Sequence, residues 1–358
     1  MSEIKLDMEA VEAAVLGGTI LGGGGGGSMI KGRELGELAV RIGEPRLVDV
    51  EDLPDDALIV TVSAVGAPAA KEGVAKPFAY LRAVVILKQN GGDAQGFISS
   101  ECGGIAVVNG WLQSAVFGIP VVDAPSNGRA QPIIPMGSMG LHAIPGFVSL
   151  QAAAGGNTTT GRYTEVCVRG SLMQASAAIR QFSAQAGGLV AVARNPVQAG
   201  YIKKNGAPGA VKQAIELGRA MLNVKHKGAE AIINAVTDTL GGRIVDESVV
   251  ESVELKTSGG FDTGKVIFSD YELTFWNEYM TLDKGNNRVS TFPNLIMTID
   301  AESGTPVTSA EIKEGQKVAL LVVPKERLLL GGGMRYKELF ELAEDVVGKP
   351  MVQYLDFD

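Results

Sequence analysis

The stretch GFISSECGGIAVVNGWLQSAVFGIPVVD, residues 96–123, carries the pattern that decides the fold class. It predicts a short buried strand over 96–99, a glycine-rich turn, a helix over 105–117 with one apolar face, and a strand that begins at Val121. A strand, a helix and a second strand in this order are typical of a βαβ unit. We therefore expect an α/β fold whose N-terminal sheet is mainly parallel, with helices on both of its faces.

The alternation of helices and strands continues on both sides of this stretch. Apolar residues at helical spacing predict helices over 8–20, 30–41, 76–88, 171–186 and 209–224, and short apolar runs predict strands over 46–50, 58–62, 165–170 and 189–193. Strand-like segments dominate beyond residue 243, at 266–268, 272–275, 295–299 and 318–323, before a closing helix over 336–347.

Near residue 160 the polar run NTTTG (157–161) interrupts the pattern, which suggests a boundary between two domains. We predict an α/β domain over residues 1–160 that holds the glycine-rich loop and the Cys102 turn. A second, α+β domain over 161–330 is β-rich in its later half, and residues 331–358 form a helix and tail that pack back on the first domain. The 358 residues are enough for two medium-sized cores.

Composition and charge argue against several classes of protein. Hydrophobic residues make up 46% of the chain, which is enough to bury a core. The formal net charge is −8 without a Lys/Arg-rich run, so we expect no nucleic-acid partner. Apolar stretches fall short of the roughly 20 residues that a membrane helix needs, so we expect no membrane partner. A polar, acidic start and two cysteines favour a cytoplasmic protein without a disulfide framework, and exposed apolar β segments favour a homo-oligomer.

Six consecutive glycines, from Gly22 to Gly27, follow the first predicted helix and precede Ser28. Without a Cβ atom, their backbone N–H groups can approach a ligand closely. The run lacks the Gly-Lys-Ser/Thr ending of a nucleotide-binding P-loop, because Lys31 stands outside that register. We interpret the run as a loop that lines a substrate site; a structural turn and, less favoured, a nucleotide-phosphate loop are the alternatives. The residues assigned to substrate binding are Gly24, Gly25, Gly26, Gly27 and Ser28.

Cys102 is the candidate nucleophile, because it follows a predicted strand and precedes a predicted helix. A thiolate at a helix N-terminus is stabilised by the helix dipole, and the N–H groups of Gly103 and Gly104 could stabilise an oxyanion. The arrangement is analogous to a nucleophile elbow. The structural alternative is a small buried cysteine that packs a strand end, which is how we interpret Cys167.

Polar residues near other predicted strand ends complete the candidate site. Glu101 and Asp123 are candidate acids or bases, and Asp123 follows a parallel strand at the edge where open α/β sheets bind ligands. Asn109, Arg129, His142, Asn277 and Glu278 are candidate substrate-binding residues. Each has a structural alternative: a loop cap for Asp123, a surface position for Arg129, and a solvent-exposed hairpin for the pair at 277–278. We interpret His226, between two lysines, as part of a solvated face.

Motifs spread over nearly the whole chain resemble one family. They are LGGGGGG at 21–27, Asp49, LPDD at 53–56, GAP at 66–68 with Glu72, ECGG at 101–104, GIPVVDA at 118–124, GRA-x-P at 128–132, GGFD-x-G at 259–264, NE at 277–278 and PNLI at 293–296. Together they resemble the S-methyl-thiohydantoin desulfurase-like family. The resemblance implies an N-terminal α/β domain and a C-terminal β-rich domain. It also implies an enzyme that replaces the methylthio group of a hydantoin-type ring with oxygen.

Three functions remain open from the sequence. The first is a hydrolase-like enzyme acting on a small hydantoin-type heterocycle, with Cys102 as nucleophile and no cofactor. The second is a metal-dependent cyclic amide hydrolase that holds a divalent metal with Glu101, Asp123 and His142. The third is a non-catalytic protein that binds a small molecule or accompanies a ring-opening enzyme.

Overall fold

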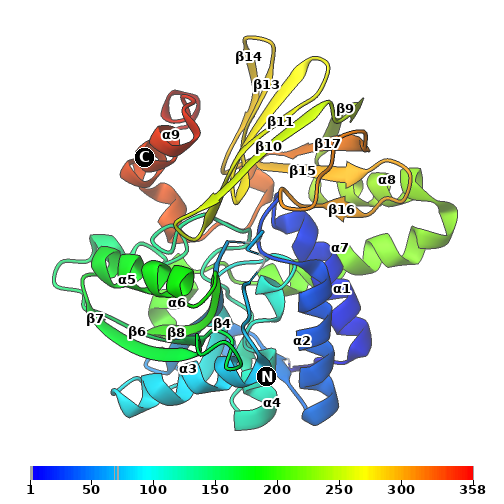
Figure 1. The fold of residues 1–358 in the computed structure, drawn as a ribbon. Helices are drawn as coiled ribbons and strands as arrows, with labels where there is room; N and C mark the ends of the chain where they lie inside the picture. Colours follow the sequence, from blue (N-terminus) through cyan, green and yellow to red (C-terminus); the bar gives the residue numbers. More distant parts are fainter. Residues whose placement is uncertain (1–2, 68, 71, 358) are drawn as a thin grey trace.

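The N-terminal half of the chain builds one eight-stranded sheet, which lies in the lower part of Figure 1. The computed structural model describes residues 3–67, 69–70 and 72–357, so Pro68 of the GAP motif and the outermost residues of the two predicted terminal units lie outside it. The sheet runs in the order β1-β2-β5-β4-β3-β8-β6-β7. These strands are β1 Ile4–Lys5, β2 Arg46–Val48, β3 Leu58–Gly66, β4 Gly96–Ser99, β5 Val121–Val122, β6 Ser149–Gly155, β7 Thr164–Gly170 and β8 Leu189–Gln198.

Strands β2, β5, β4 and β3 pair in parallel at the centre of the sheet. β1 extends it on one side and β8, β6 and β7 on the other, all by antiparallel pairing. The parallel centre confirms the predicted α/β class. β7 and β8 come after residue 160, so the large sheet takes strands from both sides of the predicted domain boundary.

Helices cover both faces of the large sheet, as the alternation of its side chains requires. Ala152 and Ala154 of β6 share a buried cluster with α3 (Pro77–Gln89), while Ala153 between them shares another with α5 (Leu172–Gln185). Successive residues of a strand point to opposite faces, so one strand carries both contacts. The remaining helices are α1 Met8–Leu21, α2 Met29–Ile42, α4 Trp111–Phe117, α6 Ala199–Asn205, α7 Ala210–Val224, α8 Ala229–Leu240 and α9 Lys337–Val347. In the part of the chain that the structure describes, no helix is both long and apolar enough to cross a membrane.

The helix predicted over 105–117 is wrong in its first half. A 3₁₀ turn, η2 (Ala106–Val108), follows the glycine-rich turn, and α4 begins only at Trp111. Gly110 separates the two with a φ of 97°, a left-handed conformation that an α-helix cannot contain. The turn at 101–104 therefore does not lie at the N-terminus of an α-helix.

The C-terminal half contains two antiparallel sheets, in the upper part of Figure 1. The five-stranded sheet is a meander of β10 Ser252–Ser258, β11 Phe261–Ile267, β12 Tyr271–Trp276, β13 Glu278–Lys284 and β14 Asn287–Thr291. The four-stranded sheet contains β9 Arg243–Val249, β15 Leu295–Asp300, β16 Pro306–Val307 and β17 Lys317–Val323. This confirms the predicted β-rich C-terminal half.

The closing helix α9 lies beside the five-stranded sheet, where it contacts β11 and β12. Phe340 of α9 packs in one cluster with Trp276 and Phe292, and Met136 from the first half of the chain belongs to the same cluster. The C-terminal segment thus joins residues from both halves of the molecule.

Candidate active site

A cavity lies where the large sheet, the glycine run and the five-stranded sheet meet. Its volume is about 80 Å³, which limits a ligand to a small molecule. Residues that line it come from both halves of the chain: Gly26, Gly27, Ala64, Val65, Gly66, Ser100, Glu101, Ile105, Ala106, Asn109, Gln131, Pro132, Ile133, Ile134, Arg180, Leu189, Arg194, Asn277 and Glu278. Of the residues predicted from sequence, Gly26, Gly27, Glu101, Asn109, Asn277 and Glu278 are among them.

The glycine run serves mainly as a close-packed connection between the two halves. The carbonyl of Gly23 accepts from the Tyr279 amide of β13 (2.8 Å), and the carbonyl of Gly26 accepts from the amides of Ile105 (3.1 Å) and Ala106 (3.2 Å). A Cβ atom on Gly24 would lie 2.6 Å from the Tyr279 ring, and one on Gly25 would overlap the Glu278 carboxyl group. Gly24, Gly25 and Ser28 do not line the cavity. Ser28 instead caps α2, where its hydroxyl accepts from the Lys31 amide at 3.4 Å.

Glu101 is the half-buried carboxyl group on one wall of the cavity. The Gln131 side chain donates from Nε2 to Glu101 Oε2 at 2.5 Å. Burial raises the pKa of Glu101 to about 7, against the opposing effects of a hydrogen bond from the Gln131 backbone and of the nearby guanidinium groups. A carboxyl group that titrates near neutral pH is suited to general acid–base catalysis.

Glu278 is the second carboxyl group of the cavity, and it is 2% exposed. Its Oε2 atom has no hydrogen-bond partner. Burial, and then the charge of Glu101, raise the pKa of Glu278 well above its ordinary value, although Arg129 opposes this. Two interacting carboxyl groups share protons between them, so at neutral pH the pair can hold one proton to donate and one site to accept.

Two arginines that the sequence prediction missed lie on the cavity wall. Arg194 of β8 is 2% exposed, and its Nε and Nη1 atoms have no hydrogen-bond partner. Arg180 of α5 donates to the backbone carbonyls of Gly66 (3.2 Å), Gly260 (2.9 Å) and Pro132 (3.2 Å). Buried guanidinium donors without a partner are costly, so Arg194 is prepared to bind an acceptor atom of a ligand.

Asn109 and Asn277 add uncharged polar groups to the cavity. Asn109 is 1% exposed and its Oδ1 atom has no partner. Asn277 forms the corner between β12 and β13 with a φ of 57°, and its Oδ1 accepts from the Asp262 amide at 2.9 Å. The pair Asn277 and Glu278 thus lies in the cleft between the two halves, and the solvent-exposed hairpin alternative is wrong.

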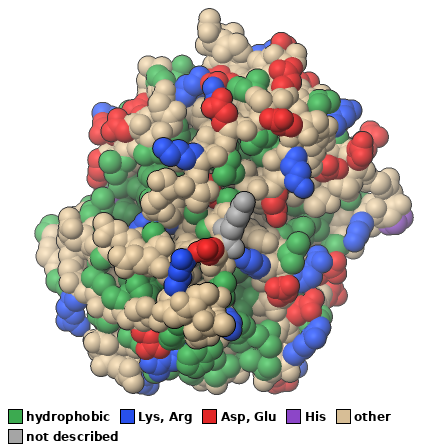
Figure 2. All heavy atoms as spheres, viewed as in Figure 1, with side chains coloured by type: hydrophobic (Ala, Val, Ile, Leu, Met, Phe, Trp, Pro, Cys, Tyr) green, Lys and Arg blue, Asp and Glu red, His purple; other side chains and the backbone are tan. Residues whose placement is uncertain are grey.

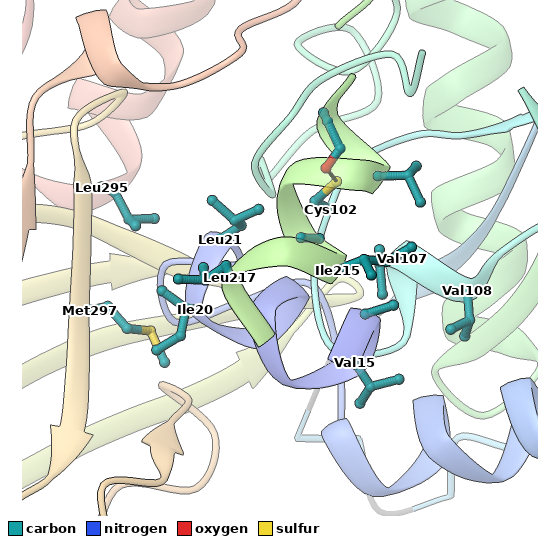
Figure 3. Close-up of a cluster of buried hydrophobic side chains, with 14 of the residues drawn as sticks. Val15, Ile20, Leu21, Cys102, Val107, Val108, Ile215, Leu217, Leu295 and Met297 are labelled. Atoms are coloured by element: carbon teal, nitrogen blue, oxygen red, sulfur yellow. Dashed lines mark hydrogen bonds between the residues drawn. The ribbon is translucent and has the colours of Figure 1, made fainter. Parts of the chain in front are cut away.

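Cys102 points away from this cavity and into the hydrophobic core. Figure 3 shows its side chain among Leu21, Val107, Ile215 and Leu217, and the residue is fully buried. Burial, followed by the charges of Asp123 and Glu101, raises the pKa of the Cys102 thiol well above its ordinary value, which opposes thiolate formation. These features favour the structural interpretation of Cys102 that the sequence left open.

Gly103 and Gly104 also do not line the cavity. They lie against the glycine run: a Cβ atom on Gly103 would be 2.7 Å from the Gly26 carbonyl oxygen, and one on Gly104 would be 2.9 Å from the Met29 amide nitrogen. Their lack of a side chain is explained by this approach of two backbone segments. The structure gives no support to the predicted oxyanion site at these two residues.

If Cys102 is structural, Cys102→Ala is expected to keep any catalytic rate of the wild type within about threefold, since no reacting group is lost. The small void should lower the free energy of unfolding by about 1 kcal/mol. Steady-state kinetics and urea denaturation measure the two effects. A mass adduct on Cys102 during turnover, or a hundredfold loss of activity in the folded variant, would instead establish the covalent mechanism.

Three other predicted residues lie outside the cavity and hold the structure together. Asp123 Oδ1 accepts from the Val211 amide at 2.8 Å, which caps the start of α7 as the structural alternative anticipated. Arg129 is fully buried rather than at the surface, where it donates to the carbonyls of Pro293 (3.0 Å) and Asn294 (2.6 Å). His142 packs edge-on against Tyr336, with 4.5 Å between ring centroids.

The predicted metal set of Glu101, Asp123 and His142 is not assembled. Glu101 lines the cavity, Asp123 caps α7, and His142 lines a separate depression between residues 141 and 173. Over residues 3–67, 69–70 and 72–357, no group of three or more His, Cys, Asp and Glu side chains is placed to hold a metal ion.

Comparison with known proteins identifies the family. The S-Me-THD-like N-terminal domain model matches residues 9–161, and the S-Me-THD-like C-terminal domain model matches residues 170–332. This chain belongs to the S-Me-THD-like family. The S-Me-THD-like protein is also similar to a crystal structure of a protein from Chromobacterium violaceum, with a TM-score of 0.71 and 22% identity over 96% of each chain. No curated protein matches it. The structural likeness shows the shared fold.

The sequence of this S-Me-THD-like protein contains a signal for Arg194 that the prediction did not use. Arg194 interrupts the apolar strand LVAVA at 189–193, and a charged residue in such a run is rarely buried unless it has a function or a partner. Arg180 and Gln131 carry no comparable signal, because an arginine on an amphipathic helix and a glutamine in a loop are ordinary surface residues. Only the folded chain brings them to Glu101.

The surface of this S-Me-THD-like protein carries mixed charge on the face shown in Figure 2. Lys and Arg side chains alternate with Asp and Glu over the described part of that face, and apolar side chains lie between them. The charged groups of the candidate site lie on the wall of the cavity.

The two raised carboxyl pKa values predict how stability depends on pH. Between the ordinary pKa of 4.5 and the value of about 7 for Glu101, the unfolded chain loses protons that the folded chain retains. The free energy of unfolding should therefore fall as the pH rises from 5 to 8. In a Glu101→Gln/Glu278→Gln variant this component should vanish, so that its free energy of unfolding should fall less than that of the wild type between pH 5 and pH 8. Urea denaturation at each pH measures the difference, and equal slopes for both proteins would contradict it.

Proposed function

We propose that this protein is an enzyme that hydrolyses a small hydantoin-type ring, with an S-methyl-thiohydantoin as substrate and methanethiol as leaving group. The observation that carries the proposal is the cavity, whose wall holds two carboxyl groups of raised pKa and an arginine with unpartnered donors. Membership of the S-Me-THD-like family supports the substrate class. The nucleophile in this proposal is water rather than Cys102.

The reaction begins when water adds to the ring carbon that bears the methylthio group. Glu101 accepts one proton of the water as the new C–O bond forms, and returns it to the ring nitrogen whose C=N bond becomes single. The C–S bond then breaks, and its electron pair leaves with sulfur. Protonated Glu278 gives its proton to the sulfur and recovers one from the hydroxyl group as the carbonyl forms. Water thus supplies the carbonyl oxygen, the N–H proton and the S–H proton, without an oxidant or reductant.

Polar groups on the cavity wall hold the ring during these steps. The free Nε–H and Nη1–H groups of Arg194 suit an acceptor such as a ring carbonyl or a carboxylate. The free Oδ1 atom of Asn109 suits a ring N–H donor. A five-membered imide ring presents N–H and C=O groups side by side, which matches a site that offers both kinds of partner.

The test uses purified protein and a set of S-methyl-thiohydantoins with different ring substituents. We expect methanethiol, measured with a thiol reagent, to appear in equal amount to the corresponding hydantoin. In ¹⁸O-labelled water, the new carbonyl oxygen should carry the label. Absence of methanethiol from every member of the set at micromolar enzyme would overturn the proposed function.

A further inference from the structure

A buried chain of hydrogen bonds runs from the C-terminal segment to Glu101. The backbone N–H of Gly331 donates to Asn127 Oδ1 at 2.9 Å, and Asn127 Nδ2 donates to Gln131 Oε1 at 3.0 Å. Gln131 Nε2 then donates to Glu101 Oε2 at 2.5 Å. Asn127 is fully buried and Gln131 is 6% exposed, so water does not compete with these bonds.

The donor-to-acceptor direction of these hydrogen bonds is fixed at Gly331, the end of the series that is farthest from Glu101. An amide side chain can turn over and exchange its oxygen and nitrogen, but a backbone N–H group can only donate. Gly331 therefore requires the oxygen of Asn127 to face it, which turns Nδ2 toward Gln131. Asn127 Nδ2 also donates to the carbonyl of Arg129 at 2.8 Å. This second hydrogen bond would be lost if the oxygen and nitrogen of Asn127 exchanged places. As a result, Gln131 must present its nitrogen to Glu101.

Close packing keeps the hydrogen-bonded side chains of Asn127 and Gln131 in place. A Cβ atom on Gly137 would overlap Gln131 Nε2 and lie 2.9 Å from its Cδ atom, so Gln131 has little room to move on that side. At the other end, the amide of Gly128 donates to the carbonyl of Leu329 at 2.9 Å, which ties the segment of Asn127 to that of Gly331.

We propose that Asn127 and Gln131 are positioning residues that aim a permanent hydrogen-bond donor at Glu101 and so hold its carboxyl group, oriented for proton transfer, at the cavity. The inference rests on the proposed function for the reaction that Glu101 serves, but the effect of the chain on Glu101 can be measured without turnover. A donor that cannot become an acceptor favours the ionised carboxylate over the protonated form.

Several charged groups from other elements also face Glu101. They are Arg194 on β8, Arg180 on α5, Arg129 in the loop after β5 and Glu278 on β13. None of these is altered when the side chain of Gln131 or Asn127 is replaced, so a change in the titration of Glu101 reports the hydrogen-bond chain.

Two variants remove the donor by different means. Gln131→Met keeps the length of the side chain and the backbone of Gln131 but removes Nε2. Asn127→Leu keeps a similar side-chain volume and adds no charge, but it removes the Nδ2 donor that holds the Gln131 oxygen, so that Gln131 can turn over and accept a hydrogen bond from protonated Glu101. Both changes disfavour the ionised form of Glu101, and both are expected to raise its pKa by about one unit.

For turnover of an S-methyl-thiohydantoin, we expect kcat to fall about 10- to 100-fold in both variants while KM stays within about threefold. In the dependence of kcat on pH, the limb that follows the ionisation of Glu101 should move to higher pH. The matched control is Gln316→Met, because Gln316 also donates from its Nε2 atom to a carboxylate, Asp300 Oδ2 at 2.8 Å, but lies outside the cavity. The control should leave the pH profile in place even if it lowers stability.

A measurement without substrate separates the two proposals. The Glu101 carboxyl can be titrated by NMR on protein labelled with ¹³C at Glu Cδ, with the Glu101 signal assigned by its absence in Glu101→Gln. A raised pKa in both variants supports the positioning role even if the wild type proves inactive on every thiohydantoin, an outcome that refutes only the proposed function. An unchanged pKa and an unchanged pH limb in both variants overturn the positioning role. Should Gln131→Met not fold, the uncharged variant Asn127→Leu decides the question alone.

Discussion

Glu101→Gln is expected to lower kcat for methanethiol release about 10³-fold, in line with the loss of a general acid–base group. Glutamine has nearly the same shape as glutamate but cannot accept a proton from water. Since the ring would still meet Arg194 and Asn109, KM should change by less than about threefold. The loss should therefore appear in kcat and kcat/KM alike, which is the pattern of a group that acts in the transition state.

The control for this variant is Glu254→Gln. Glu254 lies on β10 with its side chain exposed, and its ion pair with Lys265 at 3.3 Å lies outside the cavity. It should retain full activity, as surface ion pairs contribute little. If Glu101→Gln stayed within tenfold of the wild type, Glu101 would not be the base and the assignment of the water-activating group would be wrong.

Gly103→Ala is expected to have the largest effect on stability, a loss of about 3 kcal/mol in the free energy of unfolding. The new methyl group would overlap the Cα atom of Gly26 and lie 2.7 Å from its carbonyl oxygen. Both neighbours are backbone atoms, so no flexible side chain can yield. The glycine run would have to move, and with it Gly26 and Gly27 on the cavity wall, so activity should fall as well.

Gly170→Ala is the matched control for this prediction. Gly170 ends β7, its φ is not in the left-handed region, and a Cβ atom there would have no neighbour within 4 Å. It should change the free energy of unfolding by less than about 0.5 kcal/mol. Urea denaturation of both variants measures the difference. Equal stability of the two would show that the run can move away from the Glu101 turn without cost.

Several features of the fold could be predicted from local pattern. The 3.6-residue periodicity of apolar residues in α1, α2, α3 and α7 placed these helices to within about two residues. The pattern does not predict the helices α6 and α8 or, among the strands, β6. β6 is the run SLQAAAG, which has little β-propensity of its own and becomes a strand because two neighbouring strands and two helices cover it.

The candidate site was predicted in its location more than in its chemistry. Glu101, Asn277 and Glu278 were named from short polar motifs and do line one cavity. The sequence favours Cys102 because it predicts a helix directly after this residue, but Gly110 delays that helix to Trp111 and the thiol lies in the core. The two neighbours face opposite environments: Glu101 lines the cavity, and Cys102 lies in the hydrophobic core.

By itself the sequence predicted many of the strands and helices, the α/β class, the family, and the turn at 101–104 as the location of a candidate site. These follow from short-range periodicity and from motifs that need no knowledge of distant contacts. Only the tertiary structure decided which groups meet there. Arg194 on β8, Gln131 in a loop and Glu278 on β13 lie 30 to 177 residues from Glu101, and their partnership depends on how sheets and loops pack. The raised pKa values have the same origin, because burial in the folded protein is their largest cause.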